Sequence, residues 1–133
     1  MTTFHLCVST PDGRIFDDDV VSLKARMIDG DVGILANHSD YVSAVGEGEA
    51  IIHMPDGTVR KAACMGGMLS VFHNEVHLIA TTFEWADEID LERAKQAKER
   101  AEQRLRDAKE DKQEVLLAQA KLRRALVRIQ AKS

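Results

Sequence analysis

The placement of glycine and proline divides this chain into two parts. All 8 glycines and both prolines lie between Pro11 and Gly67, and residues 68–133 contain neither. Glycine and proline favour turns and interrupt helices. The charge changes as well, since residues 1–86 carry 12 acidic and 5 basic side chains while residues 87–133 carry 10 acidic and 13 basic. We therefore predict two structural units, residues 1–86 and residues 87–133.

Residues 1–86 have the pattern of a β unit. Apolar and polar residues alternate over residues 4–9 and again over residues 76–81, which places one set of side chains on each face of a strand. Further strands are expected at residues 20–27, 32–35, 41–45 and 67–72. Turn signals recur at residues 11–13, 29–31, 46–48, 55–58 and 73–75. Many short strands separated by such turns predict a sandwich or a barrel.

Residues 87–133 have the pattern of two helices. Apolar residues recur every three or four positions in two stripes, which are Leu91, Ala94, Ala97, Ala101, Leu105 and Ala108, then Val115, Ala118, Leu122, Ala125 and Ile129. Asp90 and Asp111 are the expected N-caps of the two helices. With Glu114 three residues after Asp111, the start of the second helix has the form of a capping box. A short connection near residues 107–112 makes the helices antiparallel. Because alanine buries little area, we expect this hairpin to be held weakly.

Composition excludes several classes of protein. With 44% apolar residues, 30% charged residues and a net charge of −4, the chain is neither a disordered protein nor one built to coat nucleic acid. No stretch has the roughly 20 apolar residues of a membrane helix, and the start lacks the pattern of a signal peptide. We expect a soluble cytosolic protein without direct membrane insertion, in which Cys7 and Cys64 are reduced core residues.

Four short motifs appear in order along the chain. They are Val8-Ser9-Thr10-Pro11-Asp12-Gly13, Gly33-Ile34-Leu35-Ala36-Asn37-His38, Gly66-Gly67-Met68-Leu69-Ser70-Val71 and Glu88-Ile89-Asp90-Leu91-Glu92-Arg93-Ala94. In this order and in a chain of this length, they resemble the epsilon subunit of bacterial F-type ATP synthases over essentially the whole sequence. Ala36 and Asp40 stand where that family usually has proline. The segment around His38 is therefore less restricted in φ than in the family.

The resemblance implies an α+β fold, with a ten-stranded β-sandwich followed by an antiparallel two-helix hairpin. It also implies a non-catalytic subunit of the central stalk, on the cytoplasmic face of the bacterial plasma membrane, which helps couple proton-driven rotation to ATP synthesis. Its partners are then the gamma subunit, the c-ring and the alpha/beta catalytic head. The hairpin is expected to inhibit ATP hydrolysis when it extends. No cofactor is required, but ATP is an expected regulatory ligand.

The family motif for ATP binding, Ile/Leu-Asp-x-x-Arg-Ala, stands here as Ile89, Asp90, Arg93 and Ala94. Other side chains could supply the partners of ribose and phosphates if the hairpin closes. They are Glu84, Arg100, Arg124 and Arg128. The alternative is a simple N-cap with a solvated arginine, and the sequence leaves both open.

The resemblance assigns a second surface, facing gamma and the c-ring, to Asp31, Gly33, Leu35 and His38. Acid–base catalysis at His38 lacks a nucleophile, a phosphate loop or a carboxylate pair. A metal site at His73 and His77 lacks further ligands with suitable spacing, so we expect none. A different kind of function also remains open, namely a stand-alone adaptor whose hairpin binds another helical partner.

Overall fold

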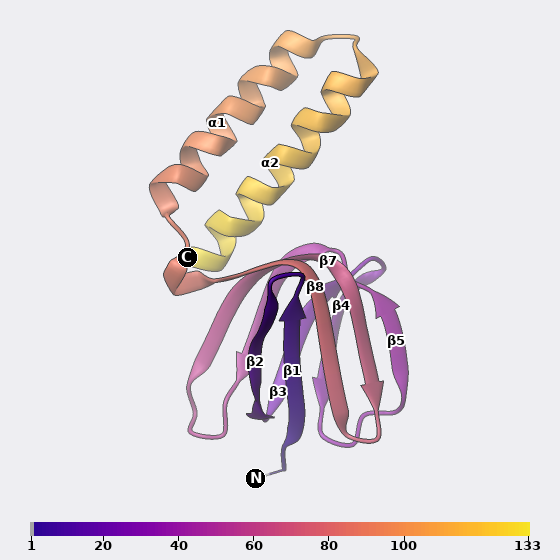
Figure 1. The fold of residues 1–133 in the computed structure, drawn as a ribbon. Coiled ribbons are helices and arrows are strands. Elements are labelled where there is room, and N and C mark those ends of the chain that lie inside the picture. Colours follow the sequence, from indigo (N-terminus) through magenta and orange to yellow (C-terminus); the bar gives the residue numbers. More distant parts are fainter. Residues whose placement is uncertain (1) are drawn as a thin grey trace.

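The computed structural model describes residues 2–133 and consists of a β-sandwich that carries a helical hairpin at one end (Figure 1). The strands are β1 (Phe4–Thr10), β2 (Gly13–Val20), β3 (Ser22–Met27), β4 (Gly30–Leu35), β5 (Tyr41–Ala44), β6 (Glu47–His53), β7 (Val59–Phe72) and β8 (Glu75–Trp85). A 3-10 turn, η1 (Ala86–Glu88), leads into α1 (Leu91–Ala108) and α2 (Lys112–Lys132). The predicted α+β fold is thus confirmed.

One continuous sheet makes both layers of the sandwich. Its strand order is β2-β1-β8-β7-β6-β3-β4, and β5 pairs with β7 beside this path. The first half of β7 pairs with β6 and its second half pairs with β5. Gly66 and Gly67 stand between these halves with φ values of 72° and 112°, a backbone region that favours glycine. These two glycines let β7 pass from one layer to the other.

The expected number of ten strands is wrong, because the described residues form eight. The two long strands β7 and β8, of 14 and 11 residues, each run through the bend without a break in register. Strands β2 and β6 were not expected. In β2 only Phe16 and Val20 are buried, and three consecutive aspartates hide the alternation. Gly46 and Gly48 suggested a turn, but Gly46 directly precedes β6 and Gly48 lies within it.

A single apolar core fills the sandwich, with residues from both layers. Leu6, Val8, Leu69 and Leu78 are completely buried. Both cysteines are free and buried, as predicted. Burial raises the pKa of Cys64 to about 12, so this thiol stays protonated at neutral pH.

The hairpin has the predicted caps. The carboxylate of Asp90 accepts a hydrogen bond from the Arg93 amide at 3.1 Å, and Asp111 accepts bonds from the Gln113 and Glu114 amides. The second half of the capping box is absent, because the Glu114 side chain accepts from Arg104 at 3.2 Å instead. Within residues 2–133, no helix combines the length and the apolar character needed to cross a membrane.

A small contact joins the hairpin to the sandwich. Its buried apolar members form one cluster, which consists of Ala63, Met65, Ile89, Val127 and Ala131. Two ion pairs flank the cluster, Arg128–Glu84 at 2.9 Å and Arg123–Glu47 at 3.0 Å. Partly exposed ion pairs contribute roughly 0–1 kcal/mol each. The hairpin is therefore held by a limited apolar contact and two pairs that salt weakens.

Candidate functional site

A cleft of about 470 Å³ lies where the hairpin meets the end of β8. Its lining comes from β8, η1 and both helices, namely Glu84, Glu88, Ile89, Asp90, Arg93, Ala94, Ala97, Arg100, Ala125 and Arg128. Carboxylates and arginines thus surround a floor of alanines. Because α2 supplies part of the wall, the complete cleft exists only while the hairpin is closed.

Seven of the eight residues predicted to bind ATP line this one cleft. The exception is Arg124, which lines the adjoining groove between the helices together with Arg100 and Arg128. Ile89 lines the cleft but is only 4% exposed, because its side chain belongs to the buried junction cluster. It therefore also anchors the hairpin to the sandwich.

The local structure places each charged group for a simple reason. Glu84 is the penultimate residue of β8, and Arg128 reaches it from the last turns of α2. The Nε of Arg128 donates to Oε1 of Glu84 at 2.9 Å, with both side chains about one-third exposed. Arg93 lies in the first turn of α1, where Asp90 caps the helix. The interpretation of Asp90 as an N-cap is thus correct. This capping bond does not prevent Asp90 from also contacting a ligand in the cleft.

The cleft offers what a nucleotide needs. Glu84, Glu88 and Asp90 supply hydrogen-bond acceptors for ribose hydroxyls or an amino group, and the arginines supply planar donors for phosphates. The alanines allow a flat base to approach the helices. The residues present therefore fit a nucleoside polyphosphate.

Three lining residues were missed as site residues. Ala97 and Ala125 were recognised only as part of the apolar stripes, yet their small side chains form the floor where the two stripes face each other. Glu88 ends the 3-10 turn and opens the fourth motif, but it lies outside the part of that motif that the resemblance assigns to ATP binding. Facing stripes of alanine beside a charged motif are the feature that could have identified the floor.

The second predicted surface lies on the edge strand β4 and the loop that follows it. Asp31 pairs with Arg26 at 3.6 Å, and Leu35 is 62% exposed. Asp31, Gly33 and Leu35 line a shallow cleft of about 420 Å³ beside β3. His38 lies in the loop, where its Nδ1 is 2.7 Å from the carbonyl of Ser39, and it does not line this cleft.

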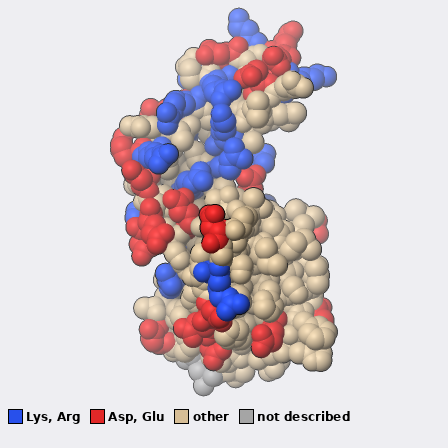
Figure 2. Space-filling view, viewed as in Figure 1, with Lys and Arg blue, Asp and Glu red and all other residues tan. Residues whose placement is uncertain are grey.

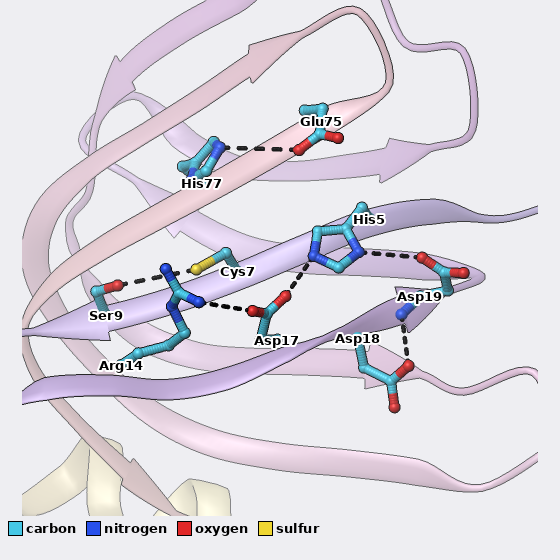
Figure 3. A network of polar contacts seen from close by, with 9 residues as sticks. All are labelled: His5, Cys7, Ser9, Arg14, Asp17, Asp18, Asp19, Glu75 and His77. Atoms are coloured by element: carbon cyan, nitrogen blue, oxygen red, sulfur yellow. Dashed lines mark hydrogen bonds and ion pairs between the residues drawn. The ribbon is translucent and has the colours of Figure 1, made fainter.

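Another polar cluster joins the outer surfaces of β1 and β2 (Figure 3). His5 contacts Asp17 through Nε2 and Asp19 through Nδ1, the latter at 3.1 Å. Since the two ring nitrogens contact different carboxylates, this geometry suits a protonated imidazole rather than a metal ligand. In the described part of the chain, no group of three or more His, Cys, Asp or Glu side chains is placed to hold a metal.

Comparison with known proteins identifies the family. A family profile described as ATP synthase, Delta/Epsilon chain, beta-sandwich domain matches residues 3–86, and the one for the long alpha-helix domain matches residues 87–133. The ATP synthase epsilon chain of Caldanaerobacter subterraneus subsp. tengcongensis is 37% identical over 98% of this chain and 94% of its own. That of Halalkalibacterium halodurans is 37% identical over 97% of this chain and 96% of its own.

Solved structures show the same fold. A chain in the Euglena gracilis mitochondrial ATP synthase, OSCP/F1/c-ring, superposes with a TM-score of 0.84 over 92% of this chain and 77% of that chain, at 21% identity. A chain in the central stalk and c-ring of the Tetrahymena thermophila mitochondrial ATP synthase superposes with a TM-score of 0.54 over 63% of this chain and 67% of that chain, at 14% identity. The sequence matches span both units, and the resemblance carried by the four motifs is confirmed: the chain belongs to the ATP synthase delta/epsilon family.

Proposed function

We propose that this chain is the epsilon subunit of a bacterial F-type ATP synthase and that its hairpin responds to ATP. Its bacterial relatives over the whole length are named ATP synthase epsilon chain. In the proposed role the sandwich binds the gamma subunit and the c-ring, on the cytoplasmic face of the plasma membrane. The chain carries no catalytic step of its own and helps couple rotation to ATP synthesis.

The observation that carries the ATP response is the position of the cleft. Ile89, Asp90, Arg93 and Ala94 come from the start of α1, while Ala125 and Arg128 come from α2. A ligand that touches both helices and the end of β8 binds the closed hairpin better than an open one. By this difference in affinity, ATP shifts the population toward the closed form.

Exposed leucines on α2 offer the hairpin a second contact, with another protein. Leu116, Leu117 and Leu126 on α2 are 66%, 51% and 45% exposed in the closed form. Apolar side chains of this size on one helix suit contact with another protein. In the proposed role, the open hairpin uses them against the alpha/beta catalytic head and thereby slows ATP hydrolysis.

Calorimetric titration with ATP tests the nucleotide site. We expect the wild-type chain to bind, and Arg93→Ala to weaken binding about tenfold through loss of a charged phosphate contact. Lys95→Ala is the matched control, since Lys95 is exposed on the same helix and does not line the cleft. Equal affinities for the two variants contradict an ATP site at this position.

Reconstitution tests the subunit assignment separately. The purified chain is mixed with the gamma subunit and with a catalytic head that lacks its own epsilon subunit. We expect a stable complex with gamma and slower ATP hydrolysis. A chain that neither binds gamma nor changes hydrolysis is not an epsilon subunit, whatever its affinity for ATP.

A further inference from the structure

A second groove, of about 370 Å³, runs between the two helices next to the cleft. Its lining consists of Ala97, Arg100, Ala101, Arg104, Lys121, Arg124 and Arg128. Ala97, Arg100 and Arg128 also line the cleft, so the two hollows join end to end. A ligand bound in the cleft can therefore extend into the groove without leaving the protein surface.

The groove differs sharply from the cleft in charge. All five of its charged lining residues are basic, whereas the cleft is also lined by three carboxylates. Figure 2 shows Lys and Arg side chains gathered along the hairpin, with acidic side chains where it meets the sandwich. Like charges facing each other across a helix pair are unfavourable, so an anion in this groove stabilises the pairing of α1 and α2 that the closed hairpin requires.

Ion pairs satisfy only the ends of the groove. Arg128 pairs with Glu84 at one end, and Arg104 pairs with Glu114 at the other. Between them, Arg100, Lys121 and Arg124 have no carboxylate within 4.0 Å among residues 2–133. The central cations are thus available to a ligand.

The length of the groove indicates what ligand it takes. Lys121 and Arg128 are seven residues apart on α2, about 10 Å at 1.5 Å per residue. A linear chain of phosphates matches a row of cations along the helix better than a single phosphate group does. Guanidinium groups match phosphate oxygens with paired donors, and the ammonium of Lys121 adds a point charge.

We propose that the groove binds linear phosphate chains longer than a triphosphate, and that Lys121 forms the subsite for the terminal phosphate. For nucleotides, this rests on the proposed function: base and ribose lie among the carboxylates of the cleft, and the phosphate chain passes Arg93 and continues into the groove. Nucleoside tetraphosphates and inorganic polyphosphate share the chemistry that the groove recognises. Both close the hairpin more tightly than ATP does.

Calorimetric titration of the full chain at low salt tests this. The probes are ATP, adenosine 5′-tetraphosphate and inorganic tetrapolyphosphate. We expect the nucleoside tetraphosphate to bind about fivefold more tightly than ATP, as one partly exposed charge contact allows. In Lys121→Ala this ratio falls to about one. Lys95→Ala removes the same charge outside both hollows and keeps the wild-type ratio.

The inorganic probe separates the two proposals. Tetrapolyphosphate binding that Lys121→Ala weakens supports the groove even if ATP gives no signal, and in that case the ATP response fails alone. If Lys121→Ala weakens the binding of both tetraphosphates no more than Lys95→Ala does, their tighter binding comes from general electrostatic attraction. The groove proposal is then wrong. Chemical-shift changes at the Lys121 side chain upon titration give an independent readout, and their absence also overturns it.

Discussion

At the scale of single residues, Arg128 links the two hollows of the hairpin. It lines both and donates to Glu84 at 2.9 Å. A guanidinium has five N–H donors, so Arg128 can keep its bond to Glu84 while other donors face a phosphate. In this arrangement Glu84 fixes the orientation of Arg128 from the sandwich side, so we expect the proposed ligand to strengthen this contact between the units instead of replacing it.

The contacts of His5 predict that the stability of the sandwich depends on pH. Hydrogen bonds to Asp19 and then to Asp17 raise the pKa of His5 above its ordinary value of 6.5. Asp17 also accepts from Arg14 at 2.8 Å, and Glu75 on β8 adds a further negative charge near the ring. A histidine whose pKa is raised by folding stabilises the protein fully below the pKa of the unfolded chain, near 6.5. This contribution is lost as pH rises through the folded-state value.

We therefore expect His5→Gln to lower the free energy of unfolding at pH 6 by no more than about 1 kcal/mol, because the ring is partly exposed. The difference should become smaller as pH rises through the folded-state pKa of His5, because the ring then loses its charge. Urea unfolding of both proteins from pH 6 to pH 9 measures it, with His77→Gln as the control for an exposed histidine on β8. A difference that stays constant with pH rules out titration of His5 as its cause.

At the scale of elements, β7 depends on one glycine. A Cβ on Gly67 would lie 1.8 Å from the carbonyl oxygen of Ile79, and its φ of 112° is unfavourable for other residues. The carbonyl of Gly67 also accepts from the Val45 amide at 2.9 Å, which ties β5 to the bend. This position therefore has to combine a close backbone approach with an unusual conformation.

Gly67→Ala should destabilise the chain by more than about 3 kcal/mol, because backbone rather than a flexible side chain must move. Gly33→Ala is the control, since a Cβ there meets nothing within 4 Å and φ is ordinary. It should change stability by less than about 0.5 kcal/mol. Thermal or urea unfolding compares the two variants, and similar losses for both contradict this account of the bend.

Some elements could be predicted from the sequence and others could not, for physical reasons. The helices were predictable because their stripes and caps are local signals, and β1 and β8 because each alternates cleanly. Strand β2 pairs only with β1 at the edge of the sheet, so most of its side chains are exposed and no alternation marks it. The bend in β7 is a tertiary feature, which the pair Gly66-Gly67 permits but does not reveal.

The candidate site was likewise predictable from the sequence only in part. The motif at the start of α1 predicted one wall of the cleft, but the alanine floor depends on how two stripes face each other. Arg124 was assigned to the same ATP site, and it lines the neighbouring groove, which shares Arg100 and Arg128 with the cleft. Placement on the second helix could not be inferred because it depends on the length of the connection between the helices.

At the scale of the whole molecule, only a small contact joins the hairpin to the sandwich. The junction cluster contains two alanines among its five members, and two partly exposed ion pairs flank it. The cleft is built from both helices and the end of β8, so a ligand there adds to a weak contact. In the proposed function, we therefore expect opening of the hairpin to cost little free energy without ligand and more when the cleft is filled.

The most direct test is the distance between hairpin and sandwich, measured by pulsed electron resonance between spin labels at Lys109 and Arg14. Both positions are exposed, whereas Cys7 and Cys64 are buried. We predict one narrow distance distribution with ATP, an additional population at other distances without it, and no effect of ATP in Arg93→Ala. A distribution that is narrow and identical with and without ATP contradicts a hairpin that opens and closes.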